Sequence, residues 1–251
     1  MKDTILEKLI DLEQRHNVRI LFACESGSRA WGFPSPDSDY DVRFIYACEP
    51  QWYVSLTEYP DVIELPVNEV LDIGGWDIRK ALRLMAKSNA VIFEWMQSPI
   101  MYRKDDAFLE ELKQIAPTSF SPIAALHHYL SMAKGKFAEC MEGEQVKLKR
   151  YMYCLRAALS ALWILHQQSI PPMELQYLLE ELPGVELRQR VAHLVELKAT
   201  QAESYLHPHE TELERFLAEG IERCEKGAAQ MPARKSDHEV LNQFLRKTIR
   251  L

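Results

Sequence analysis

The sequence contains no apolar run of membrane-spanning length. A helix that crosses a bilayer needs about 20 consecutive apolar residues, and no stretch of this 251-residue chain approaches that length. The first residues, Met1-Lys2-Asp3-Thr4, open an amphipathic segment and not the apolar core of a signal peptide. We therefore expect a cytoplasmic protein with no membrane partner.

Paired cysteines and zinc-type motifs are also absent. The five cysteines are odd in number, are scattered and form no C-x-x-C pair, which argues against a disulfide framework. We expect reduced thiols that pack as small hydrophobes. His127-His128 and the His207/His209 pair lack the spacing of zinc ligands on a helix.

The chain has no excess of positive charge. It carries 30 Lys and Arg against 37 Asp and Glu, a formal net charge of -7. A protein that coats nucleic acid is normally basic, so any contact with RNA must use a local patch. A small-molecule or protein substrate fits this charge balance equally well.

Hydrophobic periodicity divides the chain into two parts. Apolar spacing predicts a helix over 3–16, and a buried strand over 18–24 precedes a Gly-, Ser- and Pro-rich loop over 25–38. We expect strands over 39–46, 62–67 and 69–73, helical structure after Gly74-Gly75, and a linker at 228–237 before a last short helix. The second half has helical spacing throughout, and Pro117 to Pro122 mark the change. The predicted domains are 1–118, a sheet with flanking helices, and 119–251, all helical.

Two aspartates at alternate positions are the most informative chemical feature. Asp39 and Asp41 begin the strand predicted over 39–46, where alternate side chains point to the same face. Two close carboxylates repel each other unless a cation lies between them. Carboxylate oxygens suit Mg²⁺, with Mn²⁺ as a substitute.

Gly27-Ser28 lies just upstream, between the buried strand and the acidic one. Glycine lets backbone amides approach a phosphate closely, and the serine hydroxyl adds a donor. A phosphate-binding loop beside paired carboxylates is what nucleotidyl transfer needs.

A third carboxylate would complete the site. Asp72, between Leu71 and Ile73, has the apolar flanks of a strand residue and could accept the proton of an incoming hydroxyl. Asp77 is the alternative, although its position near a helix start favours a capping role.

Several longer motifs resemble the DNA polymerase beta-like nucleotidyltransferase superfamily, and within it the branch associated with RNA repair. The motifs are Gly-Ser-Arg-Ala-x-Gly at 27–32, Ser-Asp-Tyr-Asp-Val-Arg at 38–43, Gly-Trp-Asp-x-Arg-Lys-x-Leu at 75–82, and the Lys-Ser-Asn…Glu-Trp…Ser-Pro segment at 87–99. The similarity also includes 147–156 and covers most of residues 20–175. Ala90 replaces the proline expected after Asn89, a change that concerns a turn and not the chemistry.

The resemblance implies an α+β fold: a nucleotidyltransferase-type mixed sheet with flanking helices, followed by an all-α helical domain. It also implies that Gly27 and Ser28 contact the triphosphate, that Asp39 and Asp41 hold the metal ions, and that Asp72 completes the triad.

A basic and aromatic helix face in the second half adds to this interpretation. Lys149, Tyr153 and Arg156 recur at i, i+4 and i+7 and share one face. Such a face suits a base and its phosphates, so we expect these residues to bind nucleotide across a cleft from Ser28. A solvated face is the alternative.

The expected function is Mg²⁺-dependent transfer of a nucleoside monophosphate from a nucleoside triphosphate to an acceptor hydroxyl. The resemblance alone points to an RNA end as the acceptor. Transfer to a small molecule or a protein side chain is the second hypothesis, and a non-catalytic nucleotide sensor is the third. The oligomeric state stays open.

Overall fold

A computed structural model describes residues 1–66 and 70–251. The predictions of β structure at Val67 and Glu69 lie outside the described residues. The chain forms two compact units: Met1–Gly27, Asp39–Phe120 and Lys235–Leu251 make up the first, and Ser28–Ser38 with Ser121–Arg234 make up the second. The units differ from the predicted domains, 1–118 and 119–251, at two segments. Residues 28–38 belong with the helical unit, and residues 235–251 belong with the sheet.

The first unit is built on a five-stranded mixed sheet of order β3-β4-β2-β1-β5. β2 and β4 run parallel, and the other neighbouring pairs run antiparallel. The strands are β1 (Arg19–Glu25), β2 (Tyr40–Ala47), β3 (Val62–Glu64), β4 (Leu71–Asp77) and β5 (Met101–Lys104).

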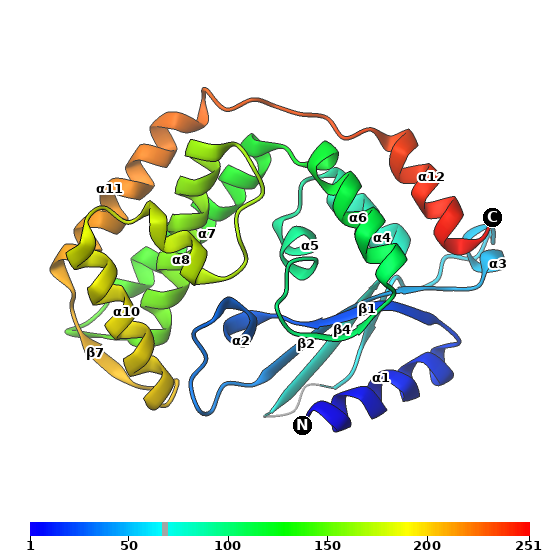
Figure 1. The fold of residues 1–251 in the computed structure, drawn as a ribbon, viewed down its shortest axis with the longest axis horizontal. Helices are drawn as coiled ribbons and strands as arrows, with labels where there is room; N and C mark the ends of the chain where they lie inside the picture. The colour runs from blue at the N-terminus through cyan, green and yellow to red at the C-terminus, as the bar shows by residue number, and fades with distance from the viewer. Residues whose placement is uncertain (67–69) are drawn as a thin grey trace. The chain divides into compact units, whose positions relative to one another are not determined.

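Helices cover both faces of this sheet (Figure 1). The predicted first helix is confirmed as α1 (Lys2–His16), and its apolar side packs Ile5, Leu9 and Leu12 on strand residues such as Phe44. α4 (Ile78–Ala86), α5 (Ala90–Trp95) and α6 (Asp106–Ser119) lie on the other side of the sheet in Figure 1. A short helix, α3 (Pro50–Tyr53), follows β2.

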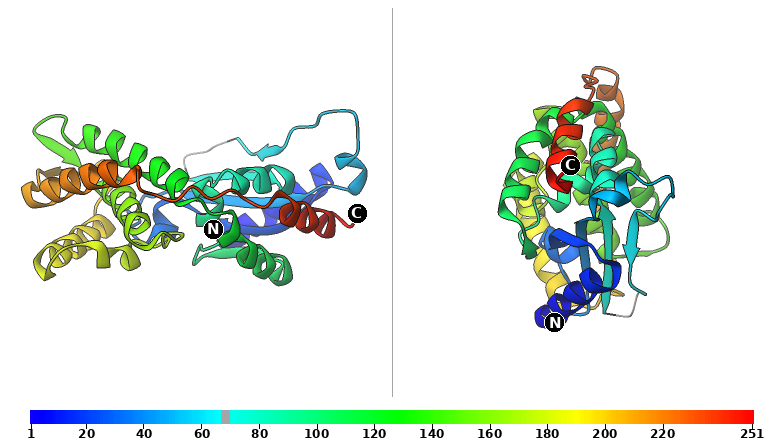
Figure 2. Two further views of the ribbon diagram at one scale, coloured as in Figure 1. Left: turned by 90° about the horizontal axis from the view of Figure 1, so that it is seen from above. Right: turned by 90° about the vertical axis from the view of Figure 1, so that its right-hand side faces the viewer.

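The last helix, α12 (His238–Ile249), returns to this unit and packs against α4 and α6. Figure 2 shows it alongside these helices. Phe244 carries part of the contact, since its ring lies 5.2 Å from that of Phe108.

The loop predicted over 25–38 contains a short helix, α2 (Gly27–Trp31), so this prediction was wrong. The helix predicted after Gly74-Gly75 is confirmed as α4, which begins at Ile78. The strand predicted over 69–73 is longer than expected, since β4 continues through both glycines to Asp77. Strand pairing on both sides of β4 overrides the low strand propensity of glycine.

The two glycines of β4 face different environments. A Cβ on Gly75 would lie 2.2 Å from the Phe44 ring, whereas one on Gly74 would be at ordinary contact distance, 3.6 Å from Glu64 Cγ. The absence of a side chain at Gly75 therefore allows the Phe44 ring to pack against the β4 backbone.

We expect Gly75→Ala to lower the free energy of unfolding by about 1–3 kcal/mol, the usual effect of overpacking a core. Gly74→Ala is the matched control and should change it by less than about 0.5 kcal/mol. Urea unfolding of both variants measures the difference, and equal values would contradict this account of Gly75.

The second unit is mainly helical, with α7, α8 and α11 packed side by side (Figures 1 and 2). Its helices are α7 (Pro122–Cys140), α8 (Leu148–Gln167), α9 (Leu175–Leu178), the 3-10 helix η1 (Leu179–Glu181), α10 (Val185–Thr200) and α11 (Thr211–Ala228). We predicted an all-helical domain, but this unit also contains a two-stranded sheet, in which β6 (Gln145–Lys147) pairs with β7 (Leu206–Pro208). Within the described part of the chain, no helix combines the length and apolar character needed to cross a bilayer.

Candidate active site

The parallel pairing of β2 with β4 brings two of the predicted carboxylates together. Asp41 and Asp72 are direct partners across the two strands, so their side chains emerge from the same face of the sheet. Both side chains are about a quarter exposed, at 24% and 28%. Two of the three predicted carboxylates, Asp41 and Asp72, therefore lie on one face of the sheet.

Arg43 supplies the positive charge between these carboxylates. Its Nη2 lies 2.6 Å from Asp72 Oδ2 and 3.4 Å from Asp41 Oδ1. Its Nη1 donates to the carbonyl oxygens of Val42 and Asp72. The negative charges of Asp41 and Asp72 are thus offset by a guanidinium.

Asp39 lies outside the strand. β2 begins at Tyr40, and Asp39 is exposed one residue earlier. The structure therefore brings Asp41 and Asp72 into one group through Arg43, whereas Asp39 precedes β2 and is exposed.

The donor set fits Mg²⁺. Two partly exposed carboxylates on one face leave room for water and phosphate oxygens, which Mg²⁺ retains as ligands in most protein sites. Among the residues that the structure describes, no three His, Cys, Asp or Glu side chains form a ready-made metal cluster. Asp41 and Asp72 would hold the ion, and Arg43 would have to move away from them.

Asp77 has a different place. It pairs with Tyr46 in the sheet register, and the alternation along β4 puts it on the face opposite Asp72. Its side chain caps α4 by accepting from Arg79 N at 2.8 Å, and it accepts from the Tyr53 hydroxyl at 2.6 Å. Burial raises the pKa of this carboxyl, and these hydrogen bonds oppose the rise. The capping interpretation of Asp77 is confirmed.

Gly27 packs directly against Asp41. Its φ is +62°, a left-handed conformation, and a Cβ at this position would lie 2.1 Å from Asp41 Oδ2. The backbone N of Ser26 also donates to the Asp41 carbonyl at 2.7 Å. Only glycine allows the chain to pass this close to the carboxylate.

A buried glutamate at the end of β1 was missed from the sequence. Glu25 is fully buried, and its Oε1 accepts from the backbone N of Asp41 at 2.8 Å. Its Oε2 accepts from the Tyr102 hydroxyl. Glu25 therefore fixes the start of β2, and no sequence pattern distinguished it from an ordinary strand-end residue.

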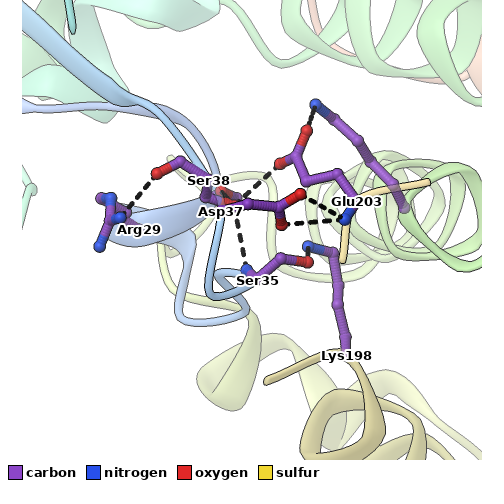
Figure 3. A network of polar contacts seen from close by, with 8 residues as sticks. Arg29, Ser35, Asp37, Ser38, Lys198 and Glu203 are labelled. Atoms are coloured by element: carbon purple, nitrogen blue, oxygen red, sulfur yellow. Dashed lines mark hydrogen bonds and ion pairs between the residues drawn. The ribbon is translucent and has the colours of Figure 1, made fainter. Parts of the chain in front are cut away.

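Ser38 lies in a network of polar contacts in the second unit (Figure 3), and Ser28 joins this network. Ser28 Oγ donates to Ser38 Oγ at 3.1 Å, and Ser38 Oγ donates to Glu203 Oε1 at 2.8 Å. Ser28 and Ser38 are each 4% exposed. Arg29 closes the same loop by donating to the Ser38 carbonyl at 2.6 Å.

The predicted basic and aromatic face of α8 contacts this loop as well. Lys149 pairs with Glu203 and lies 5.6 Å from the Tyr153 ring centre. Tyr153 meets the Trp31 ring edge-on at 5.1 Å, and the Arg156 guanidinium lies 4.4 Å from the centre of the Trp31 ring. The three residues share a face as predicted.

Arg156 is nearly buried within the unit. It is 3% exposed, and its Nε donates to the Met173 carbonyl at 3.0 Å. Contact of Lys149, Tyr153 and Arg156 with a nucleotide stays a prediction. Lys149 is more exposed than Arg156.

Comparison with known proteins assigns the chain to a family. A family model described as the RNA repair pathway DNA polymerase beta family matches residues 1–247. The chain belongs to this family. It is therefore of the polymerase beta-like nucleotidyltransferase type that its motifs resemble.

The chain is also similar to a bacterial protein along nearly its whole length. The protein named "Uncharacterized protein YcgL" of Bacillus subtilis (strain 168) is 41% identical over 251 residues, which cover 99% of this chain and 96% of that protein. A solved nucleotidyltransferase-like protein from Exiguobacterium sibiricum 255-15 aligns over 98% of this chain and 80% of its own, at 12% identity and a TM-score of 0.33. That structural overlap is too weak to support an argument.

Proposed function

We propose that the protein transfers a nucleoside monophosphate from a nucleoside triphosphate to an acceptor hydroxyl with the help of Mg²⁺. The observation that carries the proposal is the direct pairing of Asp41 with Asp72 on one open face of the sheet, beside Gly27. Family membership supports the same reaction type.

The proposed roles follow from position. Asp41 and Asp72, with Asp39 just before β2, would hold Mg²⁺, which when bound offsets negative charge on the triphosphate. Asp72 would take the proton of the acceptor hydroxyl as its oxygen bonds to the α-phosphorus. The bond from the α-phosphorus to the β-phosphate oxygen breaks, and pyrophosphate leaves.

A cavity beside Asp72 is the proposed place for the acceptor. Its volume is about 310 Å³, at the lower end of the usual range for small-molecule sites. Arg43, Asp72, Gly74, Trp76 and Trp95 are among its lining residues. A cationic group and an indole beside the proposed base suit a nucleoside with its phosphate, and this favours an RNA end over a protein side chain.

Trp76 is the residue of this cavity suited to stack a base. Trp95 is 2% exposed and lies behind it, with ring centres 4.1 Å apart, whereas Trp76 is only half-buried.

We expect Trp76→Ala to raise the KM for an RNA acceptor about tenfold, because one base–aromatic stack contributes about 1–3 kcal/mol. The KM for the nucleoside triphosphate should stay unchanged. Trp76→Phe retains a stacking ring and should recover most of the loss. Equal effects of Trp76→Ala on both KM values would exclude the acceptor role.

The acceptor class is tested by supplying α-labelled nucleoside triphosphates and Mg²⁺ with RNA, with a small hydroxyl compound, or with the protein alone. We expect label on RNA in the wild type and none with the Asp39→Ala/Asp41→Ala variant. Label on the protein or the small compound would instead support the second hypothesis. Equal labelling by wild type and variant would refute the catalytic assignment.

A further inference from the structure

Two residues predicted to bind phosphate converge on one carboxylate in the second unit. Ser28 reaches Glu203 through the Ser38 hydroxyl, and Lys149 reaches it directly. Each Glu203 oxygen receives one of these donors: Ser38 donates to Oε1 and Lys149 to Oε2. Hydroxyls and an ammonium group arranged around an anion are the donors that a phosphoryl group also takes.

The surrounding charges are balanced. Lys198 is 2% exposed and donates to Ser35 Oγ at 2.8 Å (Figure 3). A second ammonium group, besides that of Lys149, therefore lies in this network. Glu203 and Asp37 offset these two cations. Burial raises the pKa of Glu203, but the hydrogen bonds from Lys149 and Ser38 outweigh it and leave the pKa below its ordinary value. Burial lowers the pKa of Lys198.

The side chain of Glu203 is not needed to attach the loop 28–38. Asp37 already accepts from the backbone N of Glu203 at 2.9 and 3.2 Å, and Lys198 holds Ser35 independently. The main contribution of the Glu203 carboxylate is therefore a negative charge in the centre of the network, and not attachment of the loop. It is also accessible, with 23% of its side chain exposed.

We infer that Glu203 is an internal substitute for a phosphoryl group: it occupies an anion site formed by Ser38 and Lys149, and a polyphosphate must displace it to bind there. The inference rests on the proposed function, because a polyphosphate is the part of a nucleoside triphosphate that such an anion site would take. It makes Glu203 a residue that weakens nucleotide binding and keeps Lys149 oriented in the absence of ligand.

The test is titration of the full chain with inorganic triphosphate, without Mg²⁺ or acceptor. Glu203→Gln keeps the hydrogen-bonding shape and removes the charge, so we expect about tenfold tighter binding, since a neutral amide no longer competes for Lys149. Glu203→Gln/Lys149→Met should lose this gain. Glu210→Gln is the matched control, because Glu210 pairs with Arg190 and His207 in the same unit, and it should bind triphosphate like the wild type.

Equal or weaker binding by Glu203→Gln would overturn the inference, as would the same gain in Glu210→Gln. If Glu203→Gln does not fold, Glu203→Asp retracts the carboxylate by one methylene with its charge intact, and a smaller gain is expected. Unchanged binding by that variant would also overturn the inference. The gain from Glu203→Gln should persist when Asp41→Asn is added, because Asp41 does not belong to this network. Tighter triphosphate binding by Glu203→Gln, together with no transfer of label by the wild type, would refute the proposed function alone.

Discussion

Asp41→Asn is expected to abolish nucleotidyl transfer while leaving the fold intact. Charge stabilisation by a bound metal contributes several kcal/mol to the transition state, and a loss of about 4 kcal/mol corresponds to about 10³-fold in rate. The neutral amide lacks the negative charge that a carboxylate ligand gives to a metal ion, and it no longer offsets the charge of Arg43. Initial rates with an α-labelled nucleoside triphosphate measure the effect.

Asp61→Asn is the matched control for this variant. Asp61 is also an ion-paired aspartate of the first unit, with its Oδ1 2.8 Å from Lys80 Nζ, but it does not belong to the Asp41–Asp72 group. It should retain the wild-type rate. Comparable losses in both variants would mean that Asp41 acts through stability, and an active Asp41→Asn would remove it from the metal site.

Gly27→Ala is the second change with a large expected effect. A Cβ would displace Asp41 Oδ2 from its position, because the two atoms would be 2.1 Å apart. Displacement of a reacting or ligating group by about 1 Å can reduce a rate by about 10²-fold. The left-handed φ adds a cost of about 1–2 kcal/mol in stability.

Gly32→Ala separates these two effects. Gly32 has a φ of +91°, but a Cβ there would have no heavy atom within 4 Å. It should lose stability to a similar extent and retain activity. Thermal unfolding and the transfer rate together decide the outcome. If Gly32→Ala loses as much activity as Gly27→Ala, the close approach of Gly27 to Asp41 has no special role.

Local patterns predicted the elements that depend on local sequence. The apolar stripe of α1 and the buried run of β1 were both recognisable, since each follows the period of its own secondary structure. Strand pairing was not recognisable in the same way. The continuation of β4 through Gly74-Gly75 is determined by the strands on either side of it, and no local signal encodes that pairing.

The candidate site shows the same division. Asp41, Asp72 and Gly27 could be selected from residue type and spacing, and the register of β2 against β4 explains why they meet. Arg43 and Glu203 were not given roles, because each acts as a counter-ion to a residue distant in sequence: Arg43 to Asp72, and Glu203 to Lys149. Spacing alone cannot show which charge lies opposite another.

The central claim is that the Asp41–Asp72 face performs nucleotidyl transfer. It is tested most directly by two parallel reactions. In one the nucleoside triphosphate is labelled at the α-phosphorus, and in the other at the γ-phosphorus. The account predicts that the α-label enters the acceptor, that the γ-label appears in pyrophosphate, and that Asp72→Asn loses both while still binding nucleotide. Transfer of the γ-label to the acceptor, or undiminished turnover by Asp72→Asn, would contradict it.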